Sequence, residues 1–569
     1  MMDSSLPKHT VPPKTIVSKT NQGPQLWARS PIQTALIFLL CGIYVLFSTC
    51  LRADEIRTSA CQQPQPAALP SNLSSFTDAP GFAEESAKRL AGAVMIPTMS
   101  FDDMGPVDED ERWNPFKDMH IYLKTTFPLT HSKLDLAIVG GYSLLFTWNG
   151  SSKNSKPLML TGHIDVVPSL TSLDRWTYPP FSGTVDGEWI YGRGSGDCKN
   201  NVIGIMTAIE HLISSGWSPK RTIILAFGQD EEISGPRGAT NIGIYLEKIY
   251  GKNGIEMIVD EGGMNIETSY GTEFALPGIA EKGYLNVEIE VDMVGGQSVF
   301  QLIFPKICIV LILADIIILW IVAQSALRFP HPTHPLAFCR RLCQQLSRVI
   351  FDITCRARLA LTPHFRRDSA VFQPHVEHAS PIWGYLTCVA EHGDTKLIPS
   401  WIKKGMKSKN PDMDEIARKF AEVSVGNRYL VQTSKAATIF NAGLKSNALA
   451  ESARVLFNSR IDLFSSPSEV QKEYRKLIKP IAQKYSLLFE GATVSSPPYI
   501  GNITVDWTNP HEPSPISPFT IESSTAWLVF SRAVQASFGG DVITAPSAMT
   551  GNTGTYSSNS ASSIQTKSR

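Results

Sequence analysis

The chain has 569 residues, and its 52 Lys and Arg balance 52 Asp and Glu, which gives a formal net charge of zero at pH 7. This length exceeds the usual size of one folding unit and predicts two units with an added anchor or tail. No basic run is dense enough to follow a phosphate backbone, so nucleic acid is not expected as a partner. The nine cysteines form no paired CxxC motif, which predicts that His and carboxylate side chains hold any metal ion.

The first apolar run, residues 32–51, is uncharged and long enough to cross ~30 Å of hydrocarbon as a helix. We expect a retained transmembrane anchor, because the polar segment before it is longer than in the alternative, a cleaved signal peptide. Basic residues outnumber acidic ones in residues 1–31, which predicts a cytosolic tail and a lumenal location for the rest of the chain. Three acceptor motifs for N-linked sugars fit this orientation: Asn72, Asn149 and Asn502.

Residues 52–85 are rich in Pro, Ser, Gln and Ala, and we expect them to form a stalk. Beyond the stalk, short apolar runs at 158–160 and 222–227 flank a segment with helical spacing at 202–213. This order of strand, helix and strand predicts an α/β fold with a mostly parallel sheet.

Residues 283–294 alternate apolar and charged side chains, as a half-exposed strand does. The change of strand type places a domain boundary near residue 280. Further on, Ser466, Pro467 and Glu469 have the spacing of a helix N-terminus, which predicts a helix over 466–479. Pro480 is expected to end or kink this helix.

Four segments that bear acidic or His side chains follow predicted strands, at the edge where an open α/β sheet binds its ligands. His163 and Asp165 project from the same side of an extended segment. Asp197 lies in a glycine-rich turn that enters the predicted helix. Taken singly, the first pair could form a surface hydrogen bond, and Asp197 could cap the helix.

The other two segments are more acidic. Glu231 and Glu232 follow Asp230, and these three carboxylates repel one another unless they are solvated or compensated by a cation. Asp260 and Glu261 end a further short strand, where a plain turn is the alternative. Because four such segments occur in order at strand ends, we predict a site for Zn²⁺ or a similar divalent ion, with a shared aspartate able to hold two ions.

The motifs GHxDVVP, GRGxxDxK, DEE and VDEGG occur in this order, which resembles the M20 metallopeptidases and most of all the fungal vacuolar carboxypeptidase S group. The resemblance implies a catalytic α/β domain formed by residues 86–282 and 496–569. A smaller α/β lid or dimerisation domain is implied at 283–495, and a homodimer through that lid is implied as well. The same resemblance implies a single-pass type II protein of the vacuolar membrane.

The resemblance also implies a role for individual residues. The implied metal ligands are His163, Asp197, Glu232 and Asp260. Asp165 would orient His163, and Asp197 would bridge two zinc ions. Glu231 would act as the general base that takes a proton from water and returns it to the leaving amine. Arg460, on a strand-like segment, is expected to bind the free carboxylate of the substrate.

Two positions depart from the family pattern. Gln297 follows a double glycine where the family has a histidine, and glutamine cannot carry a positive charge. After the motif at 550–553 the family continues to a histidine that ligates the second metal, whereas the last histidine of this sequence is His511. We therefore expect the second metal site to lack a ligand and this chain to be inactive or nearly so.

A second apolar run, residues 307–323, is interrupted only by Asp315 and has the composition of a marginal membrane span. A crossing there would separate the two parts of the catalytic domain. We interpret residues 297–340 as foreign to the fold, as if an unspliced intron had been translated. A decayed, inactive paralogue is the alternative.

Three functions are consistent with the sequence. The first is a carboxypeptidase that removes the C-terminal residue from short peptides of the Gly-X type in the vacuolar lumen. The second is an N-acyl amino acid amidohydrolase, since its substrates also present an amide beside a free carboxylate. The third is a non-catalytic membrane glycoprotein that has kept the fold.

Overall fold

The computed structural model describes seven stretches of the chain: residues 61–66, 76–262, 266–293, 296–297, 372–445, 448–490 and 499–553. The chain divides into two compact units, Met1–Ser59 and Ala60–Arg569, and all described stretches belong to the second unit. No helix within these stretches is long and apolar enough to cross a membrane. The predicted anchor at 32–51 and the apolar run at 307–323 both lie outside the described residues.

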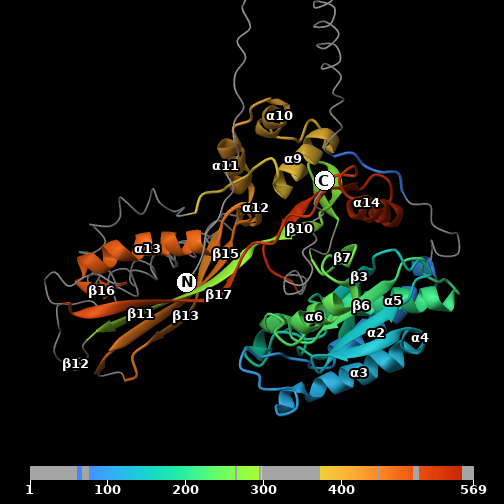
Figure 1. Cartoon of the computed structure of the whole chain (residues 1–569), viewed down its shortest axis with the longest axis horizontal. Helices are drawn as coiled ribbons and strands as arrows, with labels where there is room; N and C mark the ends of the chain where they lie inside the picture. Colours follow the sequence, from blue (N-terminus) through green and yellow to red (C-terminus); the bar gives the residue numbers. More distant parts are fainter. Residues whose placement is uncertain are drawn as a thin grey trace, which may run out of the picture. The chain divides into compact units, whose positions relative to one another are not determined.

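The first sheet has five strands in the order β1-β2-β6-β3-β7. They are β1 Asp135–Val139, β2 Ser143–Trp148, β3 Leu158–His163, β6 Ile223–Gly228 and β7 Met257–Val259. Figure 1 labels three of them, β3, β6 and β7. Strands β3, β6 and β7 run parallel, whereas β1 pairs antiparallel with β2, and β2 antiparallel with β6. The sheet is thus mixed rather than mostly parallel, because Gly140 and Gly141, both with positive φ, turn the chain back between β1 and β2.

Helices cover both faces of the first sheet, so this part of the chain has three layers. One face packs against α2 Phe82–Val94, α3 Asn114–Thr126 and α5 Lys199–Ser214, and the other face packs against α6 Ala239–Tyr250. Side chains alternate between the faces along each strand, so Phe146 and its neighbour Leu145 belong to different cores. The predicted helix at 202–213 lies within α5, and the two predicted strands are β3 and β6.

The second sheet has the strand order β13-β15-β11-β17-β16. Its strands are β11 Gly283–Met293, β13 Ser434–Ala442, β15 Ser452–Ile461, β16 Leu487–Phe489 and β17 Gly501–His511. Strand β11 alternates buried and half-buried side chains, as predicted, and is paired antiparallel on both sides. Strand β17 belongs to this sheet although it lies beyond residue 495, the predicted end of the lid. The predicted domain boundaries remain a prediction.

Helix α13, Pro467–Lys484, covers one face of the second sheet through buried residues that include Ile478 and Ala482. The hydroxyl of Ser466 accepts a hydrogen bond from the amide of Glu469, so the predicted N-cap is confirmed. The prediction for Pro480 is an end or a kink, and the end is excluded because the helix continues to Lys484. Proline removes one N–H donor, and the buried contacts on either side of it hold the flanking turns against the sheet.

A third core joins segments that lie far apart in the sequence. Four helices take part: α9 Pro381–His392, α10 Ser400–Lys407, α11 Met413–Val423 and α12 Val425–Leu430. They pack with the parallel strands β9 Thr272–Ala275 and β18 Ile543–Thr544. Strands β10 Gly278–Glu281 and β19 Ser547–Met549 also pair in parallel, and α14 Thr525–Phe538 precedes β18. The remaining short elements are α4 Pro128–Lys133, β4 Thr184–Asp186, β5 Trp189–Tyr191, β8 Glu267–Ser269, β12 Gly296–Gln297 and β14 Ala448–Leu449.

Candidate metal centre and catalytic site

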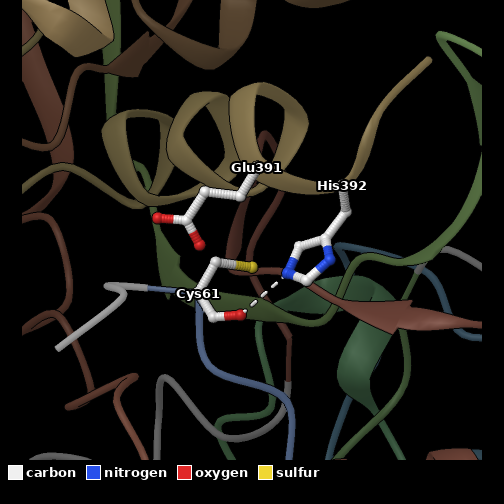
Figure 2. A group of neighbouring side chains, drawn as sticks. All are labelled: Cys61, Glu391 and His392. Atoms are coloured by element: carbon white, nitrogen blue, oxygen red, sulfur yellow. Dashed lines mark hydrogen bonds between the residues drawn. The ribbon is translucent and has the colours of Figure 1, made fainter. Parts of the chain in front are cut away.

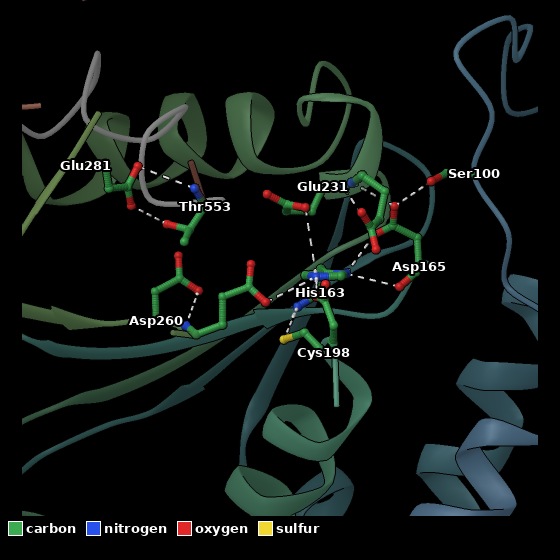
Figure 3. A network of polar contacts seen from close by, with 11 residues as sticks. Ser100, His163, Asp165, Cys198, Glu231, Asp260, Glu281 and Thr553 are labelled. Carbon is green, nitrogen blue, oxygen red and sulfur yellow. Dashed lines mark hydrogen bonds and ion pairs between the residues drawn. The ribbon is translucent and has the colours of Figure 1, made fainter. Parts of the chain in front are cut away.

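His163 is the last residue of β3 and lies at the centre of a group of carboxylates (Figure 3). Its Nε2 atom is 3.1 Å from Oδ1 of Asp197 and 3.2 Å from Oε2 of Glu261. Oε2 of Glu231 lies 3.9 Å from the same nitrogen. Burial alone would lower the pKa of His163, but the hydrogen bonds that its imidazole donates to Asp165, Asp197 and Glu261 outweigh burial and raise this pKa well above its usual value.

Asp165 holds the other side of the imidazole. Nδ1 of His163 lies 3.0 Å from the backbone oxygen of Asp165 and 3.2 Å from its Oδ1. The buried carboxylate of Asp165 accepts hydrogen bonds from the Ser100 hydroxyl and from the amides of Glu231 and Glu232. This arrangement turns Nε2 of His163 toward the carboxylates and fixes the turn that carries the two glutamates.

Glu231 and Glu232 begin a single 3-10 turn, Glu231–Ile233, which follows β6 after Gln229 and Asp230. Burial raises the pKa of Glu231 to about 9, and the carboxylates of Glu261 and Asp165 add to this effect against the influence of His163. Burial also raises the pKa of Glu232 to about 7. A cation would favour the charged form of both groups. The excess of carboxylates over basic side chains around His163 therefore fits a positively charged ligand.

Around His163, the described part of the chain contains two groups of donor atoms that are close enough to hold a metal ion. The donors of His163, Asp197 and Glu232 lie within 4.8 Å of one another, and so do those of His163, Cys198 and Glu261. Nitrogen and carboxylate donors in such a set suit Zn²⁺ and similar divalent ions. The residues thus fit the predicted metal site. The number of ions and the choice of zinc remain predictions.

The structure brings Glu261, rather than Asp260, next to His163. Oδ1 of Asp260 accepts a hydrogen bond from the amide of Glu261, and Figure 3 shows its carboxylate on the side of Glu281 and Thr553. Asp260 and Glu261 nevertheless line the same small cavity as His163. The sequence resemblance had assigned the ligand role to Asp260. Where a strand ends, a shift of one residue changes which side chain faces the site.

Cys198 is a residue of the site that the sequence did not indicate. It is 1% exposed and follows Asp197 directly, and its sulfur accepts a hydrogen bond from the amide of His163. Burial raises the pKa of its thiol well above the usual value, which keeps the thiol uncharged in the absence of a cation. Adjacency to Asp197 was the only signal in the sequence, and a lone cysteine carries no metal signature.

Arg460, the predicted carboxylate-binding residue, lies on β15 beside the motif at 550–553. Its guanidinium donates to Oδ1 of Asn552 at 2.6 Å and lies 4.8 Å from the ring centre of Tyr284. The amide of Asn552 donates in turn to the backbone oxygen of Lys282. Among the described residues, no carboxylate forms an ion pair with Arg460.

Glu281 secures the same motif from the end of β10. Its buried carboxylate accepts hydrogen bonds from the hydroxyl and the amide of Thr553, at 2.5 Å and 3.3 Å. Lys282, the next residue, is fully buried and donates to the backbone oxygens of Tyr429 and Gln432. Neither residue was singled out from the sequence, although both directly precede the predicted boundary strand.

The two departures from the family pattern are only partly visible. The backbone of Gln297 pairs with Ala448 between β12 and β14. The residues after Thr553, where a further ligand was expected in the family, lie outside the described part of the chain.

Comparison with known proteins bears directly on this site. The family described as Peptidase family M20/M25/M40 matches residues 159–563. Carboxypeptidase S of Saccharomyces cerevisiae is 32% identical over 492 residues, which cover 84% of this chain and 75% of the yeast protein. N-fatty-acyl-amino acid synthase/hydrolase PM20D1 of Xenopus tropicalis is 28% identical, over 83% of this chain and 76% of the frog protein.

The fold has a counterpart among solved structures. Human carnosine dipeptidase 1 aligns with a TM-score of 0.52 at 15% sequence identity, over 87% of this chain and 90% of the human chain. The family match spans most of the sequence and includes the segments that converge on His163. The chain therefore belongs to peptidase family M20/M25/M40, as a metallo-carboxypeptidase close to carboxypeptidase S.

Proposed function

We propose that this chain is built to hydrolyse the C-terminal amide bond of short peptides of the Gly-X type, with zinc as the metal. The observation that carries the proposal is the convergence of carboxylates from three segments on Nε2 of His163. The similarity to carboxypeptidase S supports the choice of substrate. Divalent ions held by this group would polarise the scissile carbonyl and activate a water molecule.

The side chains around His163 would divide the remaining tasks. His163, Asp197 and Glu232 would hold the metal, together with Asp260 or Glu261. Asp165 would keep the imidazole oriented through its contacts with Nδ1.

Glu231 would take a proton from water and pass it to the leaving amine. A general base works best when its pKa lies near the working pH. The pKa of about 9 would fall toward neutrality beside a cation, which would suit this role.

Arg460 would recognise the free carboxylate of the substrate. A partly buried guanidinium that pairs with a neutral amide oxygen keeps its full charge available for an anionic ligand. Asn552 would hold the guanidinium in place. Because a carboxylate next to an amide is common to dipeptides and to N-acyl amino acids, this contact alone does not select between them.

A second candidate function is hydrolysis of N-acyl amino acids. It is favoured by the 28% identity to PM20D1, a protein named as an N-fatty-acyl-amino acid synthase and hydrolase. For either function, we propose that the chain works in the vacuolar lumen as a single-pass membrane protein. The exposed side chain of Asn149 would be available there as a sugar acceptor.

The test uses the purified chain supplied with zinc. Turnover and calorimetric binding are measured with a Gly-Leu type dipeptide, its C-terminal amide and a fatty-acyl amino acid. We expect the dipeptide to bind, but to be cleaved slowly or not at all because the two family histidines are missing, and we expect the amidated form to bind weakly because Arg460 loses its partner. Binding of the fatty-acyl amino acid alone would favour the second function, and no binding of zinc or of any substrate would contradict both.

Glu231→Gln provides the first specific prediction. The comparison is made in a chain to which the two missing family histidines have been restored. The amide keeps the shape of the side chain but cannot accept the proton, so turnover should fall by roughly 10²–10⁴-fold. Zinc content, measured by atomic absorption, should stay unchanged, since Glu231 is not an expected ligand. A variant with undiminished turnover would show that another group is the base.

A further inference from the structure

A disulfide joins Cys61 to Cys388, 327 positions later in the chain. The two residues are 3% and 1% exposed, and their Cα atoms lie 5.0 Å apart, within the usual range for such a bond. Cys388 lies on α9 and belongs to the third core, which also contains Phe274 and Ile543. The bond thus fastens the segment 61–66 to a core formed by much later parts of the chain.

Hydrogen bonds hold the same segment in place. The side-chain amide of Gln63 donates to the backbone oxygen of Thr544 at 3.1 Å and accepts from its backbone N–H at 2.9 Å. Gln535 of α14 also donates to this amide, and Nε2 of His392 lies 3.1 Å from the backbone oxygen of Cys61 (Figure 2). The segment therefore forms hydrogen bonds with α9, β18 and α14.

The residues around Cys61 also have the composition of a metal site. Donor atoms of Cys61, Glu391 and His392 lie within 4.8 Å of one another (Figure 2). A cysteine ligates metal as a thiolate, and the sulfur of Cys61 is already bonded to that of Cys388. The geometry therefore favours a structural disulfide at this position over a second metal centre.

We propose that Cys61 and Cys388 are a covalent modification site that is oxidised in the secretory pathway, and that this bond holds residues 61–66 on the folded part of the chain. One thiolate attacks the disulfide of an oxidant and forms a mixed disulfide with it, and the second thiolate attacks the cysteine sulfur of that mixed disulfide and releases the oxidant's thiolate. Two electrons and two protons leave the cysteines, and the oxidant is reduced to its dithiol. Such bonds persist in oxidising compartments and are rare in the cytosol.

The bond also constrains the topology of the chain. Cys61 and Cys388 must lie on the same side of any membrane, together with the residues packed around them. The apolar run at 307–323 lies between the two cysteines, so a single crossing there would separate them. This inference does not depend on the proposed catalytic activity.

The test compares the full chain made through the secretory pathway of a eukaryotic host with the same chain made in a reducing cytosol. Thiols are blocked with N-ethylmaleimide under denaturing conditions before digestion and mass spectrometry. From the secretory host we expect a linked peptide pair containing Cys61 and Cys388, while Cys198 carries the blocking group. From the cytosol all three should carry it. The proposal would be overturned if Cys61 and Cys388 from the secretory host carried the blocking group, or if they were linked to other cysteines.

A second measurement examines the fastening itself. The double variant Cys61→Ser, Cys388→Ser is compared with the parent chain by amide hydrogen exchange. The amide of Thr544, which donates to Gln63, should exchange faster in the variant, whereas that of Leu225 in the first sheet should not change. Equal exchange at Thr544 in both proteins would show that the bond does not hold the segment.

Discussion

At the scale of single residues, Asp165 determines the orientation of His163. Its buried carboxylate lies beside Nδ1 of the imidazole and also accepts hydrogen bonds from Ser100 and from the amides of Glu231 and Glu232. One side chain thus positions a proposed metal ligand and the turn that bears two further carboxylates. Residues that orient a ligand in this way influence metal affinity without touching the metal.

Asp165→Asn should therefore weaken zinc binding by about 10- to 100-fold. The amide would place an NH₂ group where the carboxylate now accepts hydrogen bonds from N–H donors. Zinc affinity is measured by competition with a chelator, and circular dichroism verifies that the variant is folded. Ser100→Ala removes only one of the contacts of Asp165 and should show a smaller loss. Equal affinities in all three proteins would contradict the orienting role.

Neighbouring residues at the end of β7 give a sharper comparison. Glu261→Gln and Asp260→Asn make the same chemical change one position apart, but only Glu261 places a carboxylate oxygen 3.2 Å from Nε2 of His163. We expect Glu261→Gln to lower zinc affinity more than Asp260→Asn in the same chelator assay. The opposite order would support Asp260 as the ligand, as the sequence resemblance implies.

At the scale of elements, β10 and β19 are held together by more than their parallel pairing. Glu281 at the end of β10 accepts two hydrogen bonds from Thr553, which follows β19. Burial raises the pKa of Glu281 from 4.5 to about 7, although the hydrogen bond from Thr553 opposes this shift. The folded chain therefore binds a proton at Glu281 that the unfolded chain releases between pH 4.5 and 7.

This difference in pKa gives a pH-dependent stability. Because the folded state binds more protons in this window, the free energy of unfolding should fall as the pH rises from 4.5 to 7. Glu281→Gln lacks this titration, so the stability of the parent chain relative to the variant should fall by at most about 3 kcal/mol. Urea unfolding of both proteins across the pH range measures the difference. A difference that does not change with pH would rule out titration of Glu281.

The elements differ in how far the sequence could predict them. Strand β11 and helix α13 were predicted because periodicity and the cap at Ser466 are local signals. Strand β17 in the second sheet, and the shared core of α9 with β9 and β18, depend on pairing between distant segments that no local pattern encodes. The disulfide was not predicted for the same reason, since two cysteines that lie 327 residues apart form no local motif.

The residues of the candidate site also differ in whether the sequence could predict them. His163, Asp165, Asp197 and the two glutamates after β6 were predicted, because short motifs at the ends of parallel strands converge by the geometry of the sheet. Cys198 was not predicted, and Glu261 was named only as part of an acidic segment whose ligand role was given to Asp260, because each is adjacent to a residue with a stronger signal. Which of two adjacent residues faces the site depends on the direction in which the backbone orients each side chain.

At the scale of the whole molecule, one question is whether the stretch between the two described parts of the second sheet belongs to the fold. Strand β11 ends at Met293. Between this residue and residue 372, the structure describes only the short strand β12. The apolar run at 307–323 is too long to be left exposed without creating a large apolar patch. With the proposed disulfide in place, this run cannot be the only membrane crossing between Cys61 and Cys388.

The last prediction follows from this constraint. A chain that lacks residues 298–340 should retain the disulfide and both sheets. It should also give a higher soluble yield than the parent, because it loses an apolar run that cannot cross a membrane once without separating Cys61 from Cys388. Soluble yield, the mass of the linked peptide pair and zinc affinity are measured in parallel. A matched chain with residues 307–323 replaced by a polar linker of equal length separates the effect of apolarity from that of length. If both shortened and replaced chains fail to fold or lose zinc, the stretch is part of the native structure, and its interpretation as foreign sequence is wrong.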